Sequence, residues 1–315
     1  MSITPMEFAV WPGTNQAWDG IVEVARHAEL SGWDRVYVAD HFMPNGDPDD
    51  DAVVDGPMLE CWSVVAALAA AVPRIGIGTL VCGNTYRHPA VLANQAATAD
   101  VISGGRVILG LGAGWQVNEH QRYGIDMGSL KARMDRFEEA CAVVRGLRDE
   151  QRFDFAGEYY QLAGAPMEPK PIGSLPLLIG GGGEQRTLRI AARHADEWNV
   201  WSDPELFAQK SGVLDERCAE VDRDPATIRR STQALLFLSD DEAFIAKMRS
   251  RDIGMRTMVG NPEQLVEIVA AYRDAGVDEL IIPDFTLGTG EQRRETLDRF
   301  HVEVAAHFSG SSSGS

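Results

Sequence analysis

The sequence lacks the patterns that mark several large classes of protein. Its four cysteines stand far apart without a C-x-x-C pair, which argues against a zinc site or a disulfide framework and favours free thiols in a reducing compartment. No histidine pair has metal-ligand spacing and no G-x-S-x-G motif occurs, so a metal-dependent or serine hydrolase has no support. No apolar run reaches the length of a membrane span, and no signal-peptide pattern opens the chain. We therefore expect a cytoplasmic protein that holds no metal and does not enter a membrane.

Positive charge is also scarce. The 315 residues include 47 acidic and 29 basic side chains, which gives a formal net charge of −18. Such a balance argues against nucleic acid or an anionic membrane as the main partner. A small buried ligand responds only to the local electrostatic field, so the net charge of the chain does not argue against such a ligand. Hydrophobic residues make up 44% of the chain, enough for a large core.

Short apolar runs alternate with helical segments along the whole chain. The runs are apolar throughout, as is typical of parallel strands covered on both faces. We count eight strand–helix units, which favours an α/β fold: a (β/α)8 barrel with insertions, formed by residues 1–308 as a single domain. A doubly wound open sheet is the alternative. The expected strands cover residues 6–11, 35–39, 75–82, 107–111, 175–179, 197–201, 230–238 and 279–282. The expected helices cover residues 15–30, 57–71, 88–102, 130–148, 184–194, 204–221, 262–275 and 292–307.

Four segments fall outside this alternation. Residues 42–56 form an acidic stretch with proline and glycine, too long for a simple connection, so we expect a lid or binding loop. Residues 153–162 predict a small hairpin, and residues 240–259 a less regular insertion. Residues 309–315 are all serine or glycine and predict a flexible tail.

The loops that follow the strands of a barrel lie together at its C-terminal face, where active sites form in this fold. Chemically useful residues follow the second, third, fourth and fifth expected strands. They are Asp40 and His41; Leu80, Val81 and Asn84; Gly112, Ala113, Gly114 and Trp115; and Gly180, Gly181, Gly182 and Gly183. A histidine at such a position is either structural or catalytic. Five tryptophans offer either an aromatic box at this face or ordinary core packing: Trp11, Trp62, Trp115, Trp198 and Trp201.

Two glycine-rich stretches stand out among these loops. Gly110, Gly112 and Gly114 alternate at the end of the fourth strand, which lets something press against the backbone there. A dinucleotide fingerprint fails because the sixth position is Trp115 and no short turn leads into a helix. The second stretch, 180–183, directly precedes an expected helix at Glu184, and its free N–H groups with the helix dipole suit a phosphate. In both stretches the alternative is a tight turn without a ligand.

The motifs in combination resemble the bacterial luciferase-like family of flavin and deazaflavin oxidoreductases over residues 6–308. The segments that carry the resemblance are 39–42 (ADHF), 84–89 (NTYRHP), 102–106 (ISGGR), 109–115 (LGLGAGW), Glu119 with Tyr123-Gly124, 180–183 (GGGG), 186–188 (RTL) and 195–199 (ADEWN). The resemblance implies a (β/α)8 barrel and a homodimer. It places the cofactor ring at the C-terminal mouth and the cofactor phosphate near residues 180–183. It also implies a non-proline cis peptide after the third strand, by position Leu80–Val81.

Within this family the sequence is most similar to the actinobacterial branch that uses the deazaflavin coenzyme F420. The resemblance implies that His41, in the segment Asp40-His41-Phe42, lies beside the ring and acts as an acid or charge stabiliser during hydride transfer. Two positions depart from the sugar-phosphate dehydrogenases of that branch. Trp115 stands where those enzymes carry a glutamate proton donor, and Pro44-Asn45-Gly46 lacks their tryptophan. These departures favour a different substrate.

Three functions stay open on the sequence alone. The first is an F420-dependent oxidoreductase that exchanges a hydride with a small organic substrate. The second is an FMN-dependent two-component monooxygenase of the same fold, because the segment Gly112-Ala113-Gly114-Trp115 also occurs in such enzymes. The third is a non-catalytic member that only binds a flavin.

Overall fold

A closed barrel of eight parallel strands forms the centre of the protein. The computed structural model describes residues 5–46, 56–251, 253 and 256–309. The barrel order is β3-β2-β1-β13-β10-β9-β8-β5, and pairing of β3 with β5 closes the ring. The barrel strands are β1 (Glu7–Trp11), β2 (Arg35–Val38), β3 (Gly76–Thr79), β5 (Val107–Gly112), β8 (Leu177–Gly180), β9 (Glu197–Asn199), β10 (Arg229–Gln233) and β13 (Glu279–Pro283). The predicted (β/α)8 barrel is confirmed, and the open sheet is excluded.

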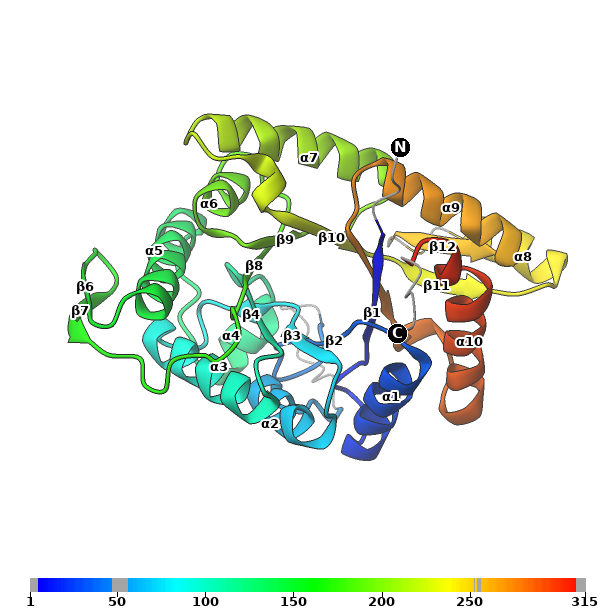
Figure 1. The fold of residues 1–315 in the computed structure, drawn as a ribbon, viewed down its shortest axis with the longest axis horizontal. Helices are drawn as coiled ribbons and strands as arrows, with labels where there is room; N and C mark the ends of the chain where they lie inside the picture. Colours follow the sequence, from blue (N-terminus) through cyan, green and yellow to red (C-terminus); the bar gives the residue numbers. More distant parts are fainter. Residues whose placement is uncertain (1–4, 47–55, 252, 254–255, 310–315) are drawn as a thin grey trace, which may run out of the picture.

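Helices surround the strands, as Figure 1 shows. Eight of them alternate with the barrel strands, and the shorter α4 and α8 lie in connections. The helices are α1 (Trp18–Ser31), α2 (Cys61–Ala71), α3 (Pro89–Ser103), α4 (Val117–Tyr123), α5 (Leu130–Asp149), α6 (Thr187–His194), α7 (Pro204–Ala219), α8 (Glu242–Arg249), α9 (Pro262–Asp274) and α10 (Gly290–Glu303). Short 3-10 turns cover Pro225–Thr227, Asp284–Thr286 and Ala305–His307. None of the helices in these described ranges is long and apolar enough to cross a bilayer.

Local sequence explains where several helices begin and end. Gly32 ends α1 in the left-handed conformation, φ 88°, which costs glycine no Cβ clash. Pro89 occupies the first turn of α3, where its missing N–H is not needed. Asn261 and Gln264 form a reciprocal capping box at the start of α9.

Several boundaries differ from those predicted; α1 begins at Trp18 and not at Asn15, and α2 begins at Cys61 and not at Pro57. The third strand is divided by a cis peptide at Leu80–Val81, so that β3 ends at Thr79 and a two-residue strand, β4 (Cys82–Gly83), follows. The predicted cis bond is thereby confirmed. Helix α6 begins at Thr187 and not at Glu184, since the glycine turn continues for three residues. The single strand predicted over residues 230–238 is two strands in the structure, β10 and the separate strand Leu235–Leu238. The loop after β5 contains α4, which the sequence analysis left as irregular.

Two small sheets lie outside the barrel. The predicted hairpin is confirmed as antiparallel strands β6 (Phe153–Ala156) and β7 (Gln161–Ala165), which project beside α5 in Figure 1. The second sheet pairs β11 (Leu235–Leu238) with β12 (Thr257–Gly260) in parallel, and α8 packs on it through Ile245 and Met248. This second sheet accounts for the insertion predicted over residues 240–259.

The core has two layers. A large outer layer packs the strands against the helices, and it includes Phe8, Phe137, Phe207 and Phe300, all fully buried. A smaller inner layer fills the barrel itself with Ala9, Trp11, Tyr37, Ala39, Leu80, Ile108, Leu178 and Ile281. Because the inner layer ends at Trp11 and Leu80, these two side chains form the boundary between the core and the open end of the barrel.

Charged residues fill the opposite, N-terminal end of the barrel. Arg35 Nη1 lies 2.7 Å from Glu197 Oε2 and 3.5 Å from Glu279 Oε2, and the Tyr37 hydroxyl donates to Glu279 Oε2 at 2.9 Å. Glu279 Oε1 is buried without a hydrogen-bond partner. Burial raises the pKa of Glu279 to about 7, although Arg35 and Arg229 oppose the shift.

Glu279 should make the protein less stable as the pH rises. An unfolded glutamate titrates near pH 4.3, so between about pH 4.3 and 7 the folded chain holds this proton more tightly. The free energy of unfolding should therefore fall across this range, and Glu279→Gln should remove about 1–3 kcal/mol of that fall. Urea unfolding at about pH 5 and pH 8 measures the difference. Glu216→Gln, at an exposed position on α7, is the control, and equal pH slopes in both variants would contradict the assignment.

Candidate active site

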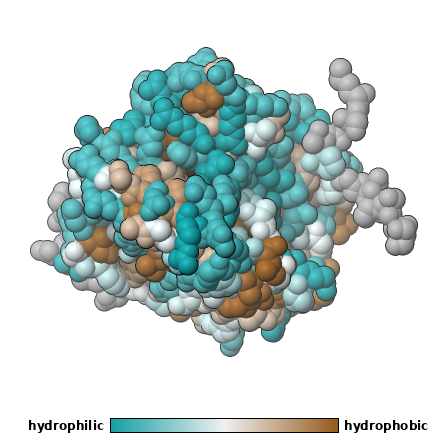
Figure 2. Space-filling model, turned by 60° about the vertical axis from the view of Figure 1, so that its left-hand side comes forward, coloured by the Kyte–Doolittle hydropathy of each residue, from teal (hydrophilic) through white to brown (hydrophobic). Residues whose placement is uncertain are grey.

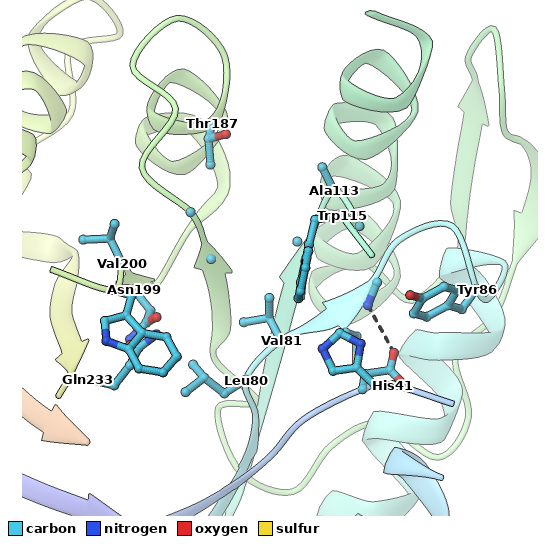
Figure 3. Close-up of a pocket in the computed structure, with 18 of the residues that line it drawn as sticks. His41, Leu80, Val81, Tyr86, Ala113, Trp115, Thr187, Asn199, Val200 and Gln233 are labelled. Carbon is cyan, nitrogen blue, oxygen red and sulfur yellow. Dashed lines mark hydrogen bonds between the residues drawn. The ribbon is translucent and has the colours of Figure 1, made fainter. Parts of the chain in front are cut away.

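A cavity of about 420 Å³ opens at the C-terminal ends of the barrel strands. Figure 3 shows it from the side: Leu80 and Val81 lie between His41 and Trp115 on one hand and Asn199 and Gln233 on the other. Its lining comes from every strand end but that of β13. The lining residues are Trp11, Asp40, His41, Leu80, Val81, Cys82, Gly83, Tyr86, Gly112, Ala113, Gly114, Trp115, Gly180, Gly181, Thr187, Asn199, Val200, Trp201 and Gln233.

Most of the predicted site residues meet in this cavity. Asn84, Gly182 and Gly183 do not line it; Asn84 is buried behind β4, where its N–H donates to the Gly112 carbonyl at 2.9 Å. The predicted acidic stretch 47–51 lies outside the described residues. Of the five tryptophans, Trp11, Trp115 and Trp201 line the cavity, and Trp62 and Trp198 belong to the core.

Sequence reasoning did not single out several lining residues as site candidates. Trp11 and Trp201 were named only for a possible aromatic box, Tyr86, Thr187 and Asn199 only within the segments that carry the family resemblance, and Val200 and Gln233 for no role in the site. Asn199 and Gln233 are the last residues of strands β9 and β10, and their place within two predicted barrel strands was the available signal.

The glycines at the end of β5 are explained by the chain itself. A Cβ on Gly110 would lie 1.9 Å from the Thr79 carbonyl oxygen, and one on Gly112 would lie 2.8 Å from a methyl group of Val81. A Cβ on Gly114, at φ 83°, would lie 2.9 Å from the Thr85 hydroxyl. What presses on this backbone is therefore the segment after β3 and not a ligand. Gly112 and Gly114 still contribute to the cavity wall.

His41 is held by a buried carboxylate that comes from the missed helix α4. His41 Nδ1 lies 2.9 Å from Glu119 Oε1, and the Phe42 N–H donates to Glu119 Oε2 at 2.8 Å. The Tyr86 hydroxyl also donates to Oε1. The side chain of Glu119 is fully buried, whereas that of His41 is 24% exposed toward the cavity. Trp115 meets the imidazole edge-on, with the ring centres 5.6 Å apart.

The protonation of this cluster follows from its contacts. Burial by itself raises the pKa of Glu119, but the hydrogen bonds from His41, the Phe42 amide and Tyr86 outweigh it, so the pKa lies below its usual value. Burial and the nearby Glu119 raise the pKa of Tyr86, which keeps that hydroxyl protonated. An ionised carboxylate at Nδ1 holds a proton on that nitrogen and leaves Nε2 as the ring atom available to a ligand.

Asp40 has a positioning role beside His41. Its carboxylate accepts from both Nη atoms of Arg87, at 2.7 and 3.0 Å, and from the Gly83 N–H at 3.1 Å, the bond drawn dashed in Figure 3. Burial raises the pKa of Asp40, and Arg87 opposes the shift. Since all these partners belong to the chain, Asp40 fixes the loop after β4 against the loop after β2.

The glycine turn after β8 offers two free amides. The Gly181 N–H donates to the Asn199 carbonyl at 2.8 Å, and the Gly181 carbonyl accepts from Trp198 Nε1 at 2.9 Å. In the described structure the N–H groups of Gly182 and Gly183 have no partner. Lys210 lies beside Gly182 and pairs with Glu184 at 2.6 Å. Amides and a cation at one turn suit an anionic group.

A barrel of this topology, with a largely apolar cavity that carries a few polar groups at its C-terminal mouth, is the scaffold of a small-molecule enzyme. The model of the luciferase-like monooxygenase family matches residues 1–252, and the chain belongs to this family.

The proteins that are similar to this chain include enzymes named for F420 and an enzyme solved with modified FMN. The F420-dependent glucose-6-phosphate dehydrogenase of Nocardia farcinica is 30% identical, over 90% of this chain and 92% of that protein. An F420-dependent secondary alcohol dehydrogenase in complex with an F420–acetone adduct has a similar structure, with a TM-score of 0.81, 20% identity, and coverage of 96% of this chain and 99% of that one. A riboflavin lyase solved with modified FMN gives a TM-score of 0.78 at 17% identity, over 99% of this chain and 94% of that one. At these identities the two structures show a shared fold.

Glu119→Gln tests whether Glu119 positions the His41 ring for catalysis or only stabilises the fold. The amide keeps the shape of the side chain but loses the charge that holds the His41 proton on Nδ1, so turnover should fall at least ~10-fold. The ¹⁵N signals of the His41 ring should shift toward the other tautomer, which a purely structural role would not cause. Glu119→Asp keeps the charge and should restore part of the activity. Unchanged ring signals in Glu119→Gln would refute the positioning role.

Proposed function

We propose that the protein is an F420-dependent oxidoreductase that exchanges a hydride with a small organic substrate. The observation that carries the proposal is the carboxylate-held imidazole of His41 beside the Leu80–Val81 peptide, at the open end of a luciferase-like barrel. The relatives that match nine-tenths of this chain at about 30% identity are named F420-dependent dehydrogenases, which supports the deazaflavin over FMN.

The residues present fit a cofactor with a flat ring and a phosphate. Leu80 and Val81 offer an apolar support for a ring, and Gly112, Ala113, Gly114 and Trp115 flank it. The unpaired amides of Gly182 and Gly183, with Thr187 and Lys210 nearby, would hold the phosphate. When bound, a deazaflavin supplies or accepts a hydride, that is, two electrons and one hydrogen nucleus.

His41 is the proposed catalytic residue. Glu119 keeps a proton on Nδ1, so Nε2 can accept a proton from an alcohol or, when protonated, donate one to a carbonyl oxygen. A protonated imidazole also stabilises negative charge that develops on a neighbouring ring. Trp115 covers the edge of the imidazole and limits its contact with water. These residues supply proton transfer and charge stabilisation to the hydride exchange.

An FMN-dependent two-component monooxygenase remains the second candidate. The segment Gly112–Trp115 supports this candidate because it also occurs in such enzymes. The structural similarity to a riboflavin lyase solved with modified FMN supports it as well. The two candidates differ in which cofactor the apoprotein binds. A protein that binds either cofactor but turns over no substrate would be the non-catalytic member.

We further propose that the protein works in the cytoplasm as a homodimer. All four cysteines are buried and free, which supports a reducing compartment. Figure 2 shows a mainly hydrophilic surface on which apolar side chains gather in a few places. Val91 and Ile102 on α3 are about half exposed, as apolar residues of an interface would be in the isolated chain.

Cofactor titration tests the function and the phosphate turn together. The apoprotein should bind F420 with micromolar or tighter affinity, and Gly182→Asp should weaken this binding at least ~10-fold because it places a negative charge at the phosphate. A Cβ at Gly182 meets Val200 at 2.9 Å, so Gly182→Ala is the control for the steric cost alone. Fluorescence titration and thermal melting should show similar stability in both variants and weak binding only in Gly182→Asp. Binding of FMN but not F420 would instead favour the second candidate, and equal affinities in the two variants would place the phosphate elsewhere.

His41→Ala should abolish most turnover without unfolding the protein. Loss of a proton-transfer and charge-stabilising group typically costs ~10²–10⁴-fold in rate. Steady-state consumption of the cofactor measures the effect, and F420 titration confirms that the site is intact. His307→Ala, at an exposed histidine of the C-terminal 3-10 turn, is the control. Wild-type turnover in His41→Ala would make His41 structural.

A further inference from the structure

The two sides of the cavity differ in chemistry. The side near β8 carries the glycine turn and Thr187, and the free amides of this turn suit an anion; Lys210 lies beside Gly182 and does not line the cavity. The other side is formed by Trp11 at the end of β1, Gln233 at the end of β10, and Trp201 after β9. These strands lie on one side of the barrel, in the order β1-β13-β10-β9, and the rings of Trp11 and Trp201 are in contact, so we group the three side chains as one wall of the cavity. This Trp11–Trp201–Gln233 wall is not used by the proposed cofactor site.

The Trp11–Trp201–Gln233 wall has no positive charge. No lysine or arginine lines the described cavity, and none occurs among the residues outside the described ranges. Arg87 lies close by, but Asp40 and Glu60 occupy its guanidinium. A phosphorylated substrate on this side would give up its hydration without meeting a cation, inside a chain of net charge −18.

The same wall carries uncharged polar atoms without partners. Trp11 Nε1, Trp201 Nε1 and Gln233 Oε1 are all buried and have no hydrogen bond. Trp11 and Gln233 are only 9% and 6% exposed, and the indole rings of Trp11 and Trp201 pack 5.8 Å apart. Buried donors and acceptors are nearly always paired in folded proteins, so unpaired ones beside a cavity indicate a ligand with complementary groups. Two indole donors require an acceptor oxygen, and the indole faces require an apolar body.

We propose that the Trp11–Trp201–Gln233 wall binds an uncharged, largely apolar ketone or secondary alcohol and rejects sugar phosphates. The ligand oxygen accepts from a free indole N–H, and the hydroxyl of an alcohol can also donate to Gln233 Oε1. The identity of the reaction rests on the proposed function. In the direction of reduction, a reduced deazaflavin bound in the cavity would supply the hydride for a new C–H bond at the carbonyl carbon as the C=O π bond breaks, and protonated His41 would give its Nε2 proton to the oxygen. The ketone is reduced and the deazaflavin is oxidised; oxidation of the alcohol reverses each step.

Ligand binding to the protein without cofactor tests the charge preference directly. Cyclohexanone and 4-oxocyclohexane carboxylate share a ring and a carbonyl group and differ by one negative charge. Saturation-transfer NMR should show binding of cyclohexanone at least ~10-fold stronger than that of the carboxylate, and none of glucose 6-phosphate, because the wall offers no cation. Equal or stronger binding of either anion would overturn the proposal.

Variants locate the binding on the wall. Trp11→Phe removes an indole donor and should weaken cyclohexanone binding by ~3–10-fold, and Gln233→Leu removes an acceptor for a hydroxyl and should weaken cyclohexanol binding by ~3–10-fold, both with F420 affinity unchanged. Trp33→Phe is the matched control: Trp33 is buried, its Nε1 is also unpaired, and it stacks on Phe300 outside the cavity. Loss of affinity in Trp33→Phe equal to that in Trp11→Phe would overturn the assignment. Gln233→Lys adds the missing cation and should shift the preference toward the carboxylate; an unchanged preference in a folded variant counts against the wall.

These measurements separate the substrate class from the cofactor assignment. If F420 does not bind, the proposed function fails, but the preference among the three ligands is still measured on the apoprotein and still decides the proposal. If F420 binds and glucose 6-phosphate is turned over more efficiently than cyclohexanone, the proposed function stands and the substrate class is wrong. Turnover of cyclohexanone with F420, with KM raised in Trp11→Phe and kcat little changed, supports both.

Discussion

The close approach of Thr79 and Val81 to the neighbouring strands is the constraint on which the open end of the barrel depends. The Thr79 hydroxyl bonds both the N–H and the carbonyl of Gly110, at 2.8 and 2.9 Å, so that β3 and β5 lie too near for a Cβ between them. Val81 fills the space that side chains at Gly112 and Gly180 would need. Strands β3, β5 and β8 can therefore close around this segment only as glycine-bearing strands, and their closure exposes Leu80 and Val81 to the cavity.

Most of the fold could be predicted because burial dictates it. A parallel strand covered on both faces must be apolar throughout, so runs such as 107–111 are visible without any structural information. The predictions failed where no turn or capping residue marks the end of one element and the start of the next. The polar strand β10 (RRSTQ) and the apolar strand β11 (LLFL) were predicted as one strand because only Ala234, and no glycine, proline or other turn residue, separates them. The start of α6 was placed three residues early because a glycine turn has no cap residue to fix its end.

The candidate site was predictable in its position and less so in its contacts. Barrel topology alone brings together residues that follow strands, which is why His41, Val81 and Gly114 meet at one cavity. The pairing of His41 with Glu119 joins residues 78 positions apart and depends on a short helix that the sequence analysis treated as loop. For the alternating glycines the prediction was too specific. Their pattern suggested contact with a ligand, but the groups that pack against them are Thr79, Val81 and Thr85 of the same chain.

Glu119 also anchors the polypeptide immediately after the imidazole that it holds. Through one carboxylate it accepts from the ring of His41 and from the main chain of Phe42, the residue at which the long connection after β2 begins. The position of the imidazole is thus fixed by Glu119 of α4, the helix that follows β5, and not by the residues after Phe42. Substitutions in the chain after Phe42 can then accumulate while the reactive group keeps its place, so that the surroundings of the site can change in evolution without loss of the chemistry.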